Sequence, residues 1–259
     1  MLRWGWAARF IGWAEMRIVF TIARRELQSY FYTPLAYVFI VAFLAGAGAA
    51  TFYIGGFMDR RQADLTPFFD YLPWLFLVLI PAVGMRLWAE ERRSGTIELL
   101  MTLPITPWQA VWGKFIAAWG FIAFTLALTF PIWITVNYLG EPDNGVIIAS
   151  YLASLLMAGT LLAATAFISA TTKSQVVAFV FSVSIGFLLM VFGTQLVLGV
   201  FDDWAPQYLV DLIASFSLLT HLAAISRGVL DITAIFFFGA LTMLFLYLNQ
   251  QLVEIRKAS

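Results

Sequence analysis

The chain contains no cysteine and only one histidine, His221, among its 259 residues. The absence of thiols excludes disulfide staples, and a single imidazole cannot build the usual zinc sites. Charged residues are also scarce, at 12%, and 15 basic residues balance 15 acidic ones, so no bulk attraction to nucleic acid is implied. We therefore expect neither a metal site nor a nucleic-acid partner.

The sequence also lacks the Gly-x-x-x-x-Gly-Lys-Ser/Thr run of a phosphate-binding loop. Its one Gly-Lys pair, Gly113-Lys114, has neither the upstream glycine nor the following hydroxyl residue. Hydroxyl residues of the apolar stretches, such as Thr165 and Ser169, are expected to hydrogen-bond within or between helices. The chain is therefore expected to have no catalytic residues and to hydrolyse no ATP by that route.

Apolar residues are abundant: they make up 62% of the chain, and the mean hydropathy is +0.88. A spanning helix needs about 20 mostly apolar residues, because the hydrocarbon layer is roughly 30 Å thick. Five stretches free of charge are long enough, and a sixth around 71–85 becomes so if Arg86 snorkels to the interface. We expect one all-α integral membrane domain over residues 1–259, with six spans at about 35–57, 68–88, 112–138, 146–170, 175–200 and 232–252. The five clear charge-free stretches contain no Asp, Glu, Lys, Arg or His, which argues against a proton relay.

The basic residues predict the orientation, since Lys and Arg are retained on the cytoplasmic side. Twelve of the 15 fall on the side that holds both termini, whereas nine of the 15 acids fall on the other side. We therefore expect a multi-pass protein of the cell membrane, the inner membrane of a bacterium, with both termini cytoplasmic.

Two segments outside the spans have patterns of their own. Residues of about 15–33 mix basic and aromatic side chains, which is typical of a helix that lies in the headgroup layer; the alternative is a solvated basic tail. Residues 212–226 are too short for a span, and a seventh span would move the basic C-terminus outside. We expect short external helices or a re-entrant hairpin there, before the last span.

A charged and polar bridge begins at Glu90, between two long apolar stretches, and reads EERRSGTIELLMTLPITPWQAVWGKFIAA. Ser94 and Gly95 break the helix. Thr96 can cap a second short helix, and Glu98 suits the positive end of its dipole. The bridge is therefore expected to contain a short helix of its own in the aqueous space.

This short helix has an apolar face, because Ile97, Leu100 and Met101 are spaced at i, i+3 and i+4. Pro104 and Pro107 end it and open the next span. The apolar face must be buried against another surface that shields it from water. A groove on another protein and the membrane surface are equally consistent with the residues alone.

The bridge resembles the first cytoplasmic loop of ABC-2 type transporter permeases. The resemblance rests on the Gly95-Thr96-Ile97-Glu98-Leu99-Leu100 core, on Thr102-Leu103-Pro104 and on the closing Gly113-Lys114. Residues 23–38, ARRELQSYFYTPLAYV, are similar to that family's interfacial helix and its entry to the first span. Residues 221–231, HLAAISRGVLD, resemble the segment before the last span in the branch of gliding-motility and multidrug-type permeases.

The resemblance implies a permease subunit of an ATP-binding cassette transporter, an exporter or related assembly, driven by ATP that a separate subunit hydrolyses. No cofactor is expected in this chain, since ATP and Mg²⁺ would be bound by that subunit. The implied partners are an ABC-type ATP-binding subunit, a second permease copy or homologous permease, and membrane lipid, with an external or periplasmic accessory subunit as a further candidate. The alternatives are a carrier or channel not driven by ATP and a membrane anchor for a soluble complex.

The resemblance also implies site residues. In the family, the segment corresponding to 95–103 is the coupling helix that docks in a cleft of the ATPase. The expected coupling residues are Gly95, Thr96, Ile97, Glu98, Leu100 and Met101, with candidate contacts from the interfacial helix at Arg24, Arg25 and Glu26. His221 and Arg227 are expected at the external face, where they either shape an exit, bind an external subunit, or have a structural role in capping or in pairing with Asp231.

Small residues permit close contacts between helices at two places in the apolar stretches. They are spaced four apart at Ala42, Gly46 and Ala50, and they recur at Gly186, Gly193 and Gly199. These contacts form either between two permease copies or within one chain.

Overall fold

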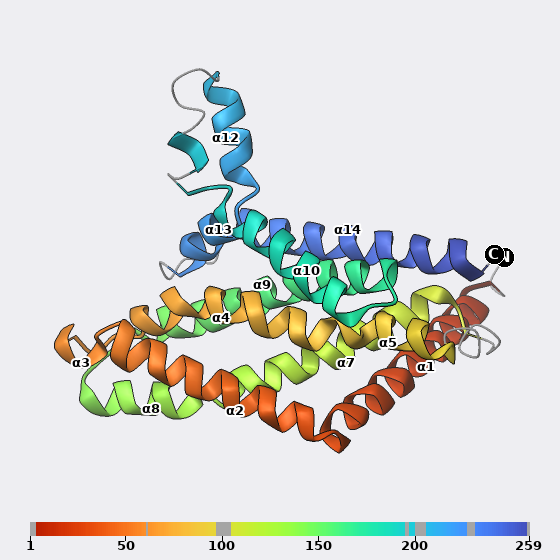
Figure 1. Ribbon diagram of the computed structural model, residues 1–259, viewed down its shortest axis with the longest axis horizontal. Coiled ribbons are helices and arrows are strands. Elements are labelled where there is room, and N and C mark those ends of the chain that lie inside the picture. Colours follow the sequence, from red (N-terminus) through yellow and green to blue (C-terminus); the bar gives the residue numbers. More distant parts are fainter. Residues whose placement is uncertain are drawn as a thin grey trace.

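The computed structural model describes residues 4–60, 62–96, 105–194, 197–199, 206–226 and 231–257, and the account below is confined to them. Within these ranges every regular element is a helix, and no strand occurs. Most of the helices lie side by side along one direction and form a bundle (Figure 1). Helix α1 begins, and α14 (Ile232–Lys257) ends, at the same end of that bundle (Figure 1).

The first two helices meet at a sharp bend. Helix α1 (Trp4–Tyr32) is followed by α2 (Pro34–Ala49), which continues into η1 (Ala50–Ile54), a π-helical turn. Thr33 between them is extended, with φ −98° and ψ 133°, because a following proline disfavours the helical conformation. The two helices form a V in Figure 1. The expected interfacial helix therefore ends where predicted but begins well before residue 15.

The next helices form one long rod with an interruption. After the short α3 (Phe57–Arg60), α4 (Thr66–Gly84) is followed by α5 (Arg86–Ser94), and only Met85 separates the two. Pro81 inside α4 removes one amide donor just before the interruption. A Cβ atom at Gly84 would lie 2.6 Å from Thr165 Cγ2 of α9 (Asn144–Thr171), so glycine is required for these helices to approach here.

The remaining helices follow in the chain. They are α7 (Pro107–Ala127), α8 (Phe130–Leu139), α9, α10 (Gln175–Val191), α12 (Gln207–Ser215), α13 (Leu218–Ile225) and α14. Thr106 and Gln109 form a capping box at the start of α7, with N···O distances of 3.3 and 3.0 Å, and Pro107 takes the first helical position. Pro107 therefore opens a helix that belongs to a candidate span, Pro107–Leu139.

Five helical segments are long and apolar enough to cross a membrane: Pro34–Arg60, Thr66–Ser94, Pro107–Leu139, Asn144–Thr171 and Ile232–Ile255. The span expected at 175–200 corresponds to α10, which has 17 residues and so falls short of the roughly 20 that the hydrocarbon layer requires. The expectation of an all-helical membrane protein is confirmed, and the sixth span stays a prediction.

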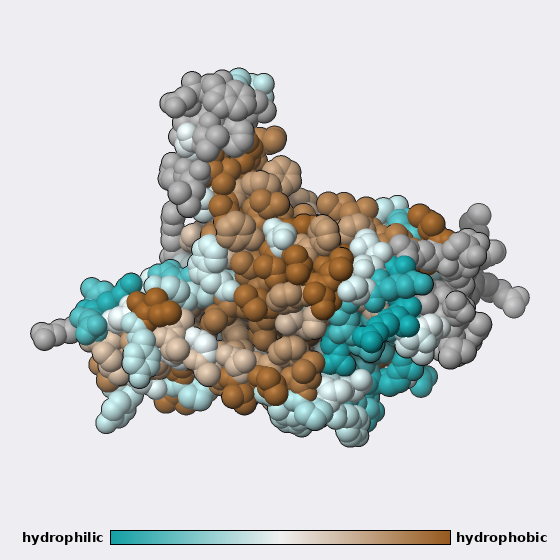
Figure 2. All heavy atoms as spheres, in the orientation of Figure 1, coloured by the Kyte–Doolittle hydropathy of each residue, from teal (hydrophilic) through white to brown (hydrophobic). Residues whose placement is uncertain are grey.

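The region before the last span contains short helices, as expected. Helix α13 packs on the bundle, whereas α12 stands away from it (Figure 1). On the face shown in Figure 2, a broad apolar band covers the middle of the bundle, and hydrophilic residues border it at the end where α5 lies. The length, composition and surface of the helices together describe a multi-pass membrane protein.

Three of the small residues singled out in the sequence face neighbours in the same chain. A Cβ atom at Gly46 would lie 3.1 Å from Leu75 Cδ2, one at Gly186 would lie 3.0 Å from Leu77 Cδ1, and one at Gly193 would lie 2.5 Å from Ser217 Cβ. These contacts favour the alternative in which the small residues serve packing within one chain.

Helix α1 packs closely along α7. The rings of Tyr30 and Phe121 stack with centroids 5.3 Å apart. A Cβ atom at Gly113 would lie 2.6 Å from Ile22 Cγ2, so a larger residue would push the two helices apart. Gly120, further along the same helix, has no such neighbour within 4 Å.

This difference generates a matched test of the α1–α7 contact. We expect Gly113→Leu to lower the free energy of unfolding by about 1–3 kcal/mol, the usual cost of overpacking. Gly120→Leu should leave stability unchanged or raise it, because glycine inside a helix is itself unfavourable. The thermal unfolding midpoint of the purified chain in detergent measures both, and equal midpoints for the two variants would contradict the contact.

Candidate functional site

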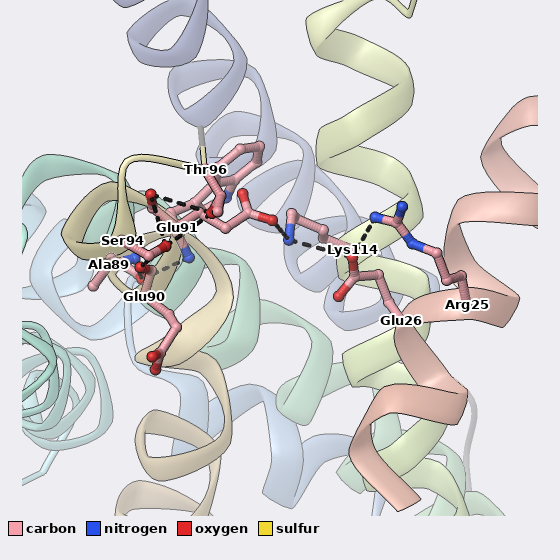
Figure 3. Close-up of polar contacts among 10 residues, drawn as sticks. Arg25, Glu26, Ala89, Glu90, Glu91, Ser94, Thr96 and Lys114 are labelled. Carbon is pink, nitrogen blue, oxygen red and sulfur yellow. Dashed lines mark hydrogen bonds and ion pairs between the residues drawn. The ribbon is translucent and has the colours of Figure 1, made fainter. Parts of the chain in front are cut away.

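The end of α5 shows where the bridge leaves the bundle. The helix ends at Ser94 because Gly95 adopts the left-handed conformation, with φ 73° and ψ 2°. Ser94 Oγ donates to the Glu90 carbonyl oxygen at 2.9 Å and lies 2.8 Å from Thr96 Oγ1 (Figure 3). The predicted helix break is therefore confirmed. Of the expected coupling residues, Gly95 and Thr96 are described, and Ile97, Glu98, Leu100 and Met101 lie outside the described residues.

A buried lysine lies close to this point. Lys114 of α7 is 4% exposed, and its Nζ lies 2.7 Å from Glu91 Oε1 of α5 and 3.6 Å from Glu26 Oε1 of α1 (Figure 3). Arg25 Nη2 lies 3.2 Å from the same Glu26 oxygen. We call these four residues the Lys114 cluster. Its charges sum to zero, and one ammonium group connects three helices that are distant in the sequence.

The surroundings of Lys114 compensate for its burial. An ammonium group loses several kcal/mol of solvation in a protein interior unless opposite charges replace the water. Two carboxylates do so here, and the ring of Trp88, with its centroid 5.4 Å from Nζ, adds a cation–π contact. Glu91 Oε2 is buried and has no hydrogen-bond partner in the described part of the chain. Glu91 therefore depends on Lys114 for its compensation.

Helix α5 is also fixed to α9. Ser169 Oγ accepts hydrogen bonds from the amides of Trp88 and Ala89 at 3.1 Å each and donates to the Met85 carbonyl oxygen at 2.7 Å. A side chain inserted into the backbone ladder in this way accounts for the interruption between α4 and α5. Arg92 Nη1 donates to the Ala170 carbonyl oxygen at 2.8 Å, near the end of α9 where helical carbonyls lack partners.

A further contact joins α5 to the start of α10. Gln175 Nε2 donates to Glu90 Oε2, and Arg86 Nε lies 3.9 Å from the same carboxylate oxygen. Polar contacts thus attach α5 to α7, α9 and α10, and Lys114 of α7 connects it to α1. A displacement of α5 must therefore either move the adjoining ends of these helices with it or break the contacts between them.

A polar cavity of about 460 Å³ lies beside the cluster. Its lining includes Arg25, Glu26 and Tyr30 of α1 and Arg86 of α5. Loss of solvation, followed by the nearby Glu26 carboxylate, raises the pKa of the Tyr30 phenol, which therefore stays neutral. The arrangement offers charge compensation and hydrogen bonding.

Among the described residues, no group of three or more potential metal ligands occurs.

The other candidate residues take different positions. Arg24 is exposed on α1 and lies outside the cluster, whereas its neighbours Arg25 and Glu26 belong to it. His221 lies on α13, with Nε2 2.9 Å from the Ser215 carbonyl oxygen and its ring stacked on Phe237 at 4.0 Å. These contacts are internal and agree with the structural alternative for His221. Arg227 lies outside the described residues.

Sequence reasoning missed the role of Lys114. It treated this residue as the close of a loop motif and counted the neighbouring apolar stretch as free of charge. Because α7 begins at Pro107, Lys114 lies about two turns inside a helix that counts as a candidate span. The signal was present: a lysine inside an apolar helix requires carboxylate partners, and Glu26 and Glu91 lie in segments predicted on the same side of the membrane.

The fold and the site define a class: a multi-pass, all-helical membrane protein that carries no ATP-binding loop motif and firmly anchors the helix leading into a polar connector. The family described as ABC-2 family transporter protein matches residues 20–253, and the chain belongs to this family. Membership gives it the role of a transport permease and confirms the resemblance found in the sequence. A comparison with curated proteins gave no significant match.

The Lys114 cluster generates a test of its own. Lys114→Met keeps the length of the side chain but leaves two carboxylates uncompensated. We expect a loss of about 3 kcal/mol of unfolding free energy, at the low end for a broken buried pair because each carboxylate side chain is still 19% exposed. The thermal unfolding midpoint in detergent measures it.

Two further variants serve as controls for this test. Arg25→Gln removes a charge of the same sign from a side chain that is 65% exposed, so it should cost less than about 1 kcal/mol. Adding Glu91→Gln to Lys114→Met should restore part of the lost stability, because the two side chains interact directly. A Lys114→Met protein as stable as Arg25→Gln would show that the cluster contributes little.

Proposed function

We propose that this chain is the transmembrane permease subunit of an ATP-binding cassette exporter in the cell membrane. Residues 95–103 form its coupling helix, which docks on a separate subunit that binds and hydrolyses ATP with Mg²⁺. The observation that carries the proposal is the attachment of α5, which leads directly into this segment, to α7, α9 and α10, and through Lys114 to α1. A segment that transmits movement to the transmembrane helices must be firmly attached to them, and α5 meets that requirement.

The contacts of α5 suggest how a displacement of residues 95–103 would be transmitted to the other helices. Displacement of residues 95–103 acts first on α5, which is nearly continuous with α4. The Lys114 cluster transmits the movement of α5 to α1 and α7. Ser169 and Arg92 transmit it to α9, and Glu90 transmits it to α10. These helix ends then move together as a rigid body. ATP binding to the partner shifts the population between two arrangements of the bundle.

The exposed surface around α5 suits a protein partner. The side chain of Arg25 is 65% exposed, and Arg24 is also exposed on the same helix. Both can reach acidic groups on an ATP-binding subunit that docks at residues 95–103. The start of α1 and the end of α14 lie at this end of the bundle, which supports a cytoplasmic location for both termini (Figure 1). A second permease copy or a homologous permease completes the assembly.

Site-specific crosslinking tests the docking directly, because a chain without cysteine allows single engineered cysteines. A tagged chain is isolated from membranes of its source cells, and copurifying proteins are identified by mass. Thr96→Cys and Leu100→Cys, labelled with a short photoreactive reagent, should crosslink to an ATP-binding subunit.

Tyr53→Cys provides the control for this experiment. Tyr53 is 87% exposed and lies in η1, toward the far end of the bundle, so it should not crosslink to that subunit (Figure 1). Equal crosslinking from all three positions would argue against docking at residues 95–103. ATP hydrolysis by the purified chain alone would overturn the proposal, as would isolation of the chain without any ATP-binding subunit.

A further inference from the structure

A second cavity, of about 510 Å³, lies between α4, α9 and α13, away from the Lys114 cluster. Much of its wall is apolar and includes the rings of Phe69 and Trp74. Small-molecule sites typically occupy about 300–1,000 Å³ and combine apolar walls with a few placed polar groups. The cavity has the size and the apolar character of such a site.

Three carboxylates line this cavity, and no basic residue occurs among the lining residues that the structure describes. Two of the three accept hydrogen bonds from nearby backbone amides: Asp64 Oδ1 accepts from the Thr66 amide at 3.0 Å, and Asp143 Oδ1, at the N-cap of α9, accepts from the Gly145 amide at 2.9 Å. Asp70 makes no hydrogen bond or ion pair with any residue that the structure describes. Its carboxylate is therefore free to face a ligand.

One basic residue among those described, Arg60, acts on the Asp70 carboxylate without lining the cavity. Arg60 of α3 interacts electrostatically with Asp70. Its Nε donates to the Gly55 carbonyl oxygen at 3.1 Å, however, and Arg60 is not among the lining residues. The described part of the lining therefore has an excess of negative charge.

Ser150 supplies an independent sign of a ligand. The residue is 1% exposed and lines the cavity. Its hydroxyl makes no hydrogen bond with the residues in the described ranges, although serines on the same helix, such as Ser154, bond back to the backbone. Ser150 Oγ is not among the buried side-chain atoms that lack a partner, so it is accessible from the cavity and can hydrogen-bond a polar group there.

We propose that this cavity binds an organic cation with an apolar body. The cationic group faces Asp70 and Ser150, and the apolar body packs against Phe69 and Trp74, whose rings also attract cations. A soluble amphipathic cation and the ammonium headgroup of phosphatidylethanolamine share this chemistry. The site is separate from the Lys114 cluster, and its occupancy requires no ATPase.

Ethidium, a fluorescent planar organic cation, is the probe. It is titrated into the purified full chain in a neutral detergent, and saturable fluorescence enhancement reports binding. We expect Asp70→Asn to weaken ethidium binding about tenfold, the effect of losing one favourable charge contact. Asp59→Asn is the matched control, because Asp59 is an exposed carboxylate of α3 that does not line the cavity. It should leave binding unchanged.

Further arms keep the test decisive. Neutral 1-N-phenylnaphthylamine should bind the unmodified chain more weakly than ethidium and should not respond to Asp70→Asn. If Asp70→Asn fails to fold, Trp74→Leu keeps the apolar wall and should still weaken ethidium binding severalfold. Competition by phosphatidylethanolamine, but not by phosphatidylglycerol, would assign the site to the lipid headgroup, and competition by neither would assign it to a soluble cation. Ethidium binding that is absent, insensitive to Asp70→Asn, or matched by the neutral dye would overturn the proposal.

Discussion

A lysine ammonium group buried between two carboxylates is the interaction on which the organisation of this protein depends. Lys114 lies inside an apolar helix, where an uncompensated charge would be expensive, and it contacts Glu91 of α5 and Glu26 of α1. The three residues come from segments that are distant in the sequence, so the requirement for compensation brings α1, α5 and α7 together. The bend at Thr33 and the glycine contact at Gly113 allow these helices to meet at that position.

The same requirement explains why one end of the bundle differs from the rest. Around α5, charged and polar groups replace the apolar packing of the membrane-crossing middle, and several of them contact a neighbouring helix. This end of the bundle is both rigid and exposed to solvent. These two properties suit a docking site at which a partner protein displaces the helices. Under the proposed function, this stiffness would connect docking at residues 95–103 to movement of the spans. The acidic cavity between α4, α9 and α13 is distant from that end and does not share its contacts.

Much of the fold could be predicted from local patterns, and most of the site could not. The charge-free stretches located the long helices, and Gly95 and Pro107 marked the ends of elements, because these effects act within a few residues. Hydropathy reports composition and not where a helix stops, so the stretch at 175–200 appeared longer than α10, which ends at Val191. The partners of Lys114 and Ser169 depend on how whole helices rotate and pack against one another. No local pattern contains that information.

The central claim is that the Lys114 cluster makes α1 and α5 one rigid unit. The most direct test is a distance measurement by electron paramagnetic resonance between spin labels at Gln28→Cys and Arg93→Cys, two exposed positions on α1 and α5, in the complex with the ATP-binding subunit. The account predicts one narrow distance distribution that is the same with and without ATP, and a broader one when Lys114→Met is added. A distance that changes with ATP while Lys114 is present, or a distribution that Lys114→Met leaves unaltered, would contradict it.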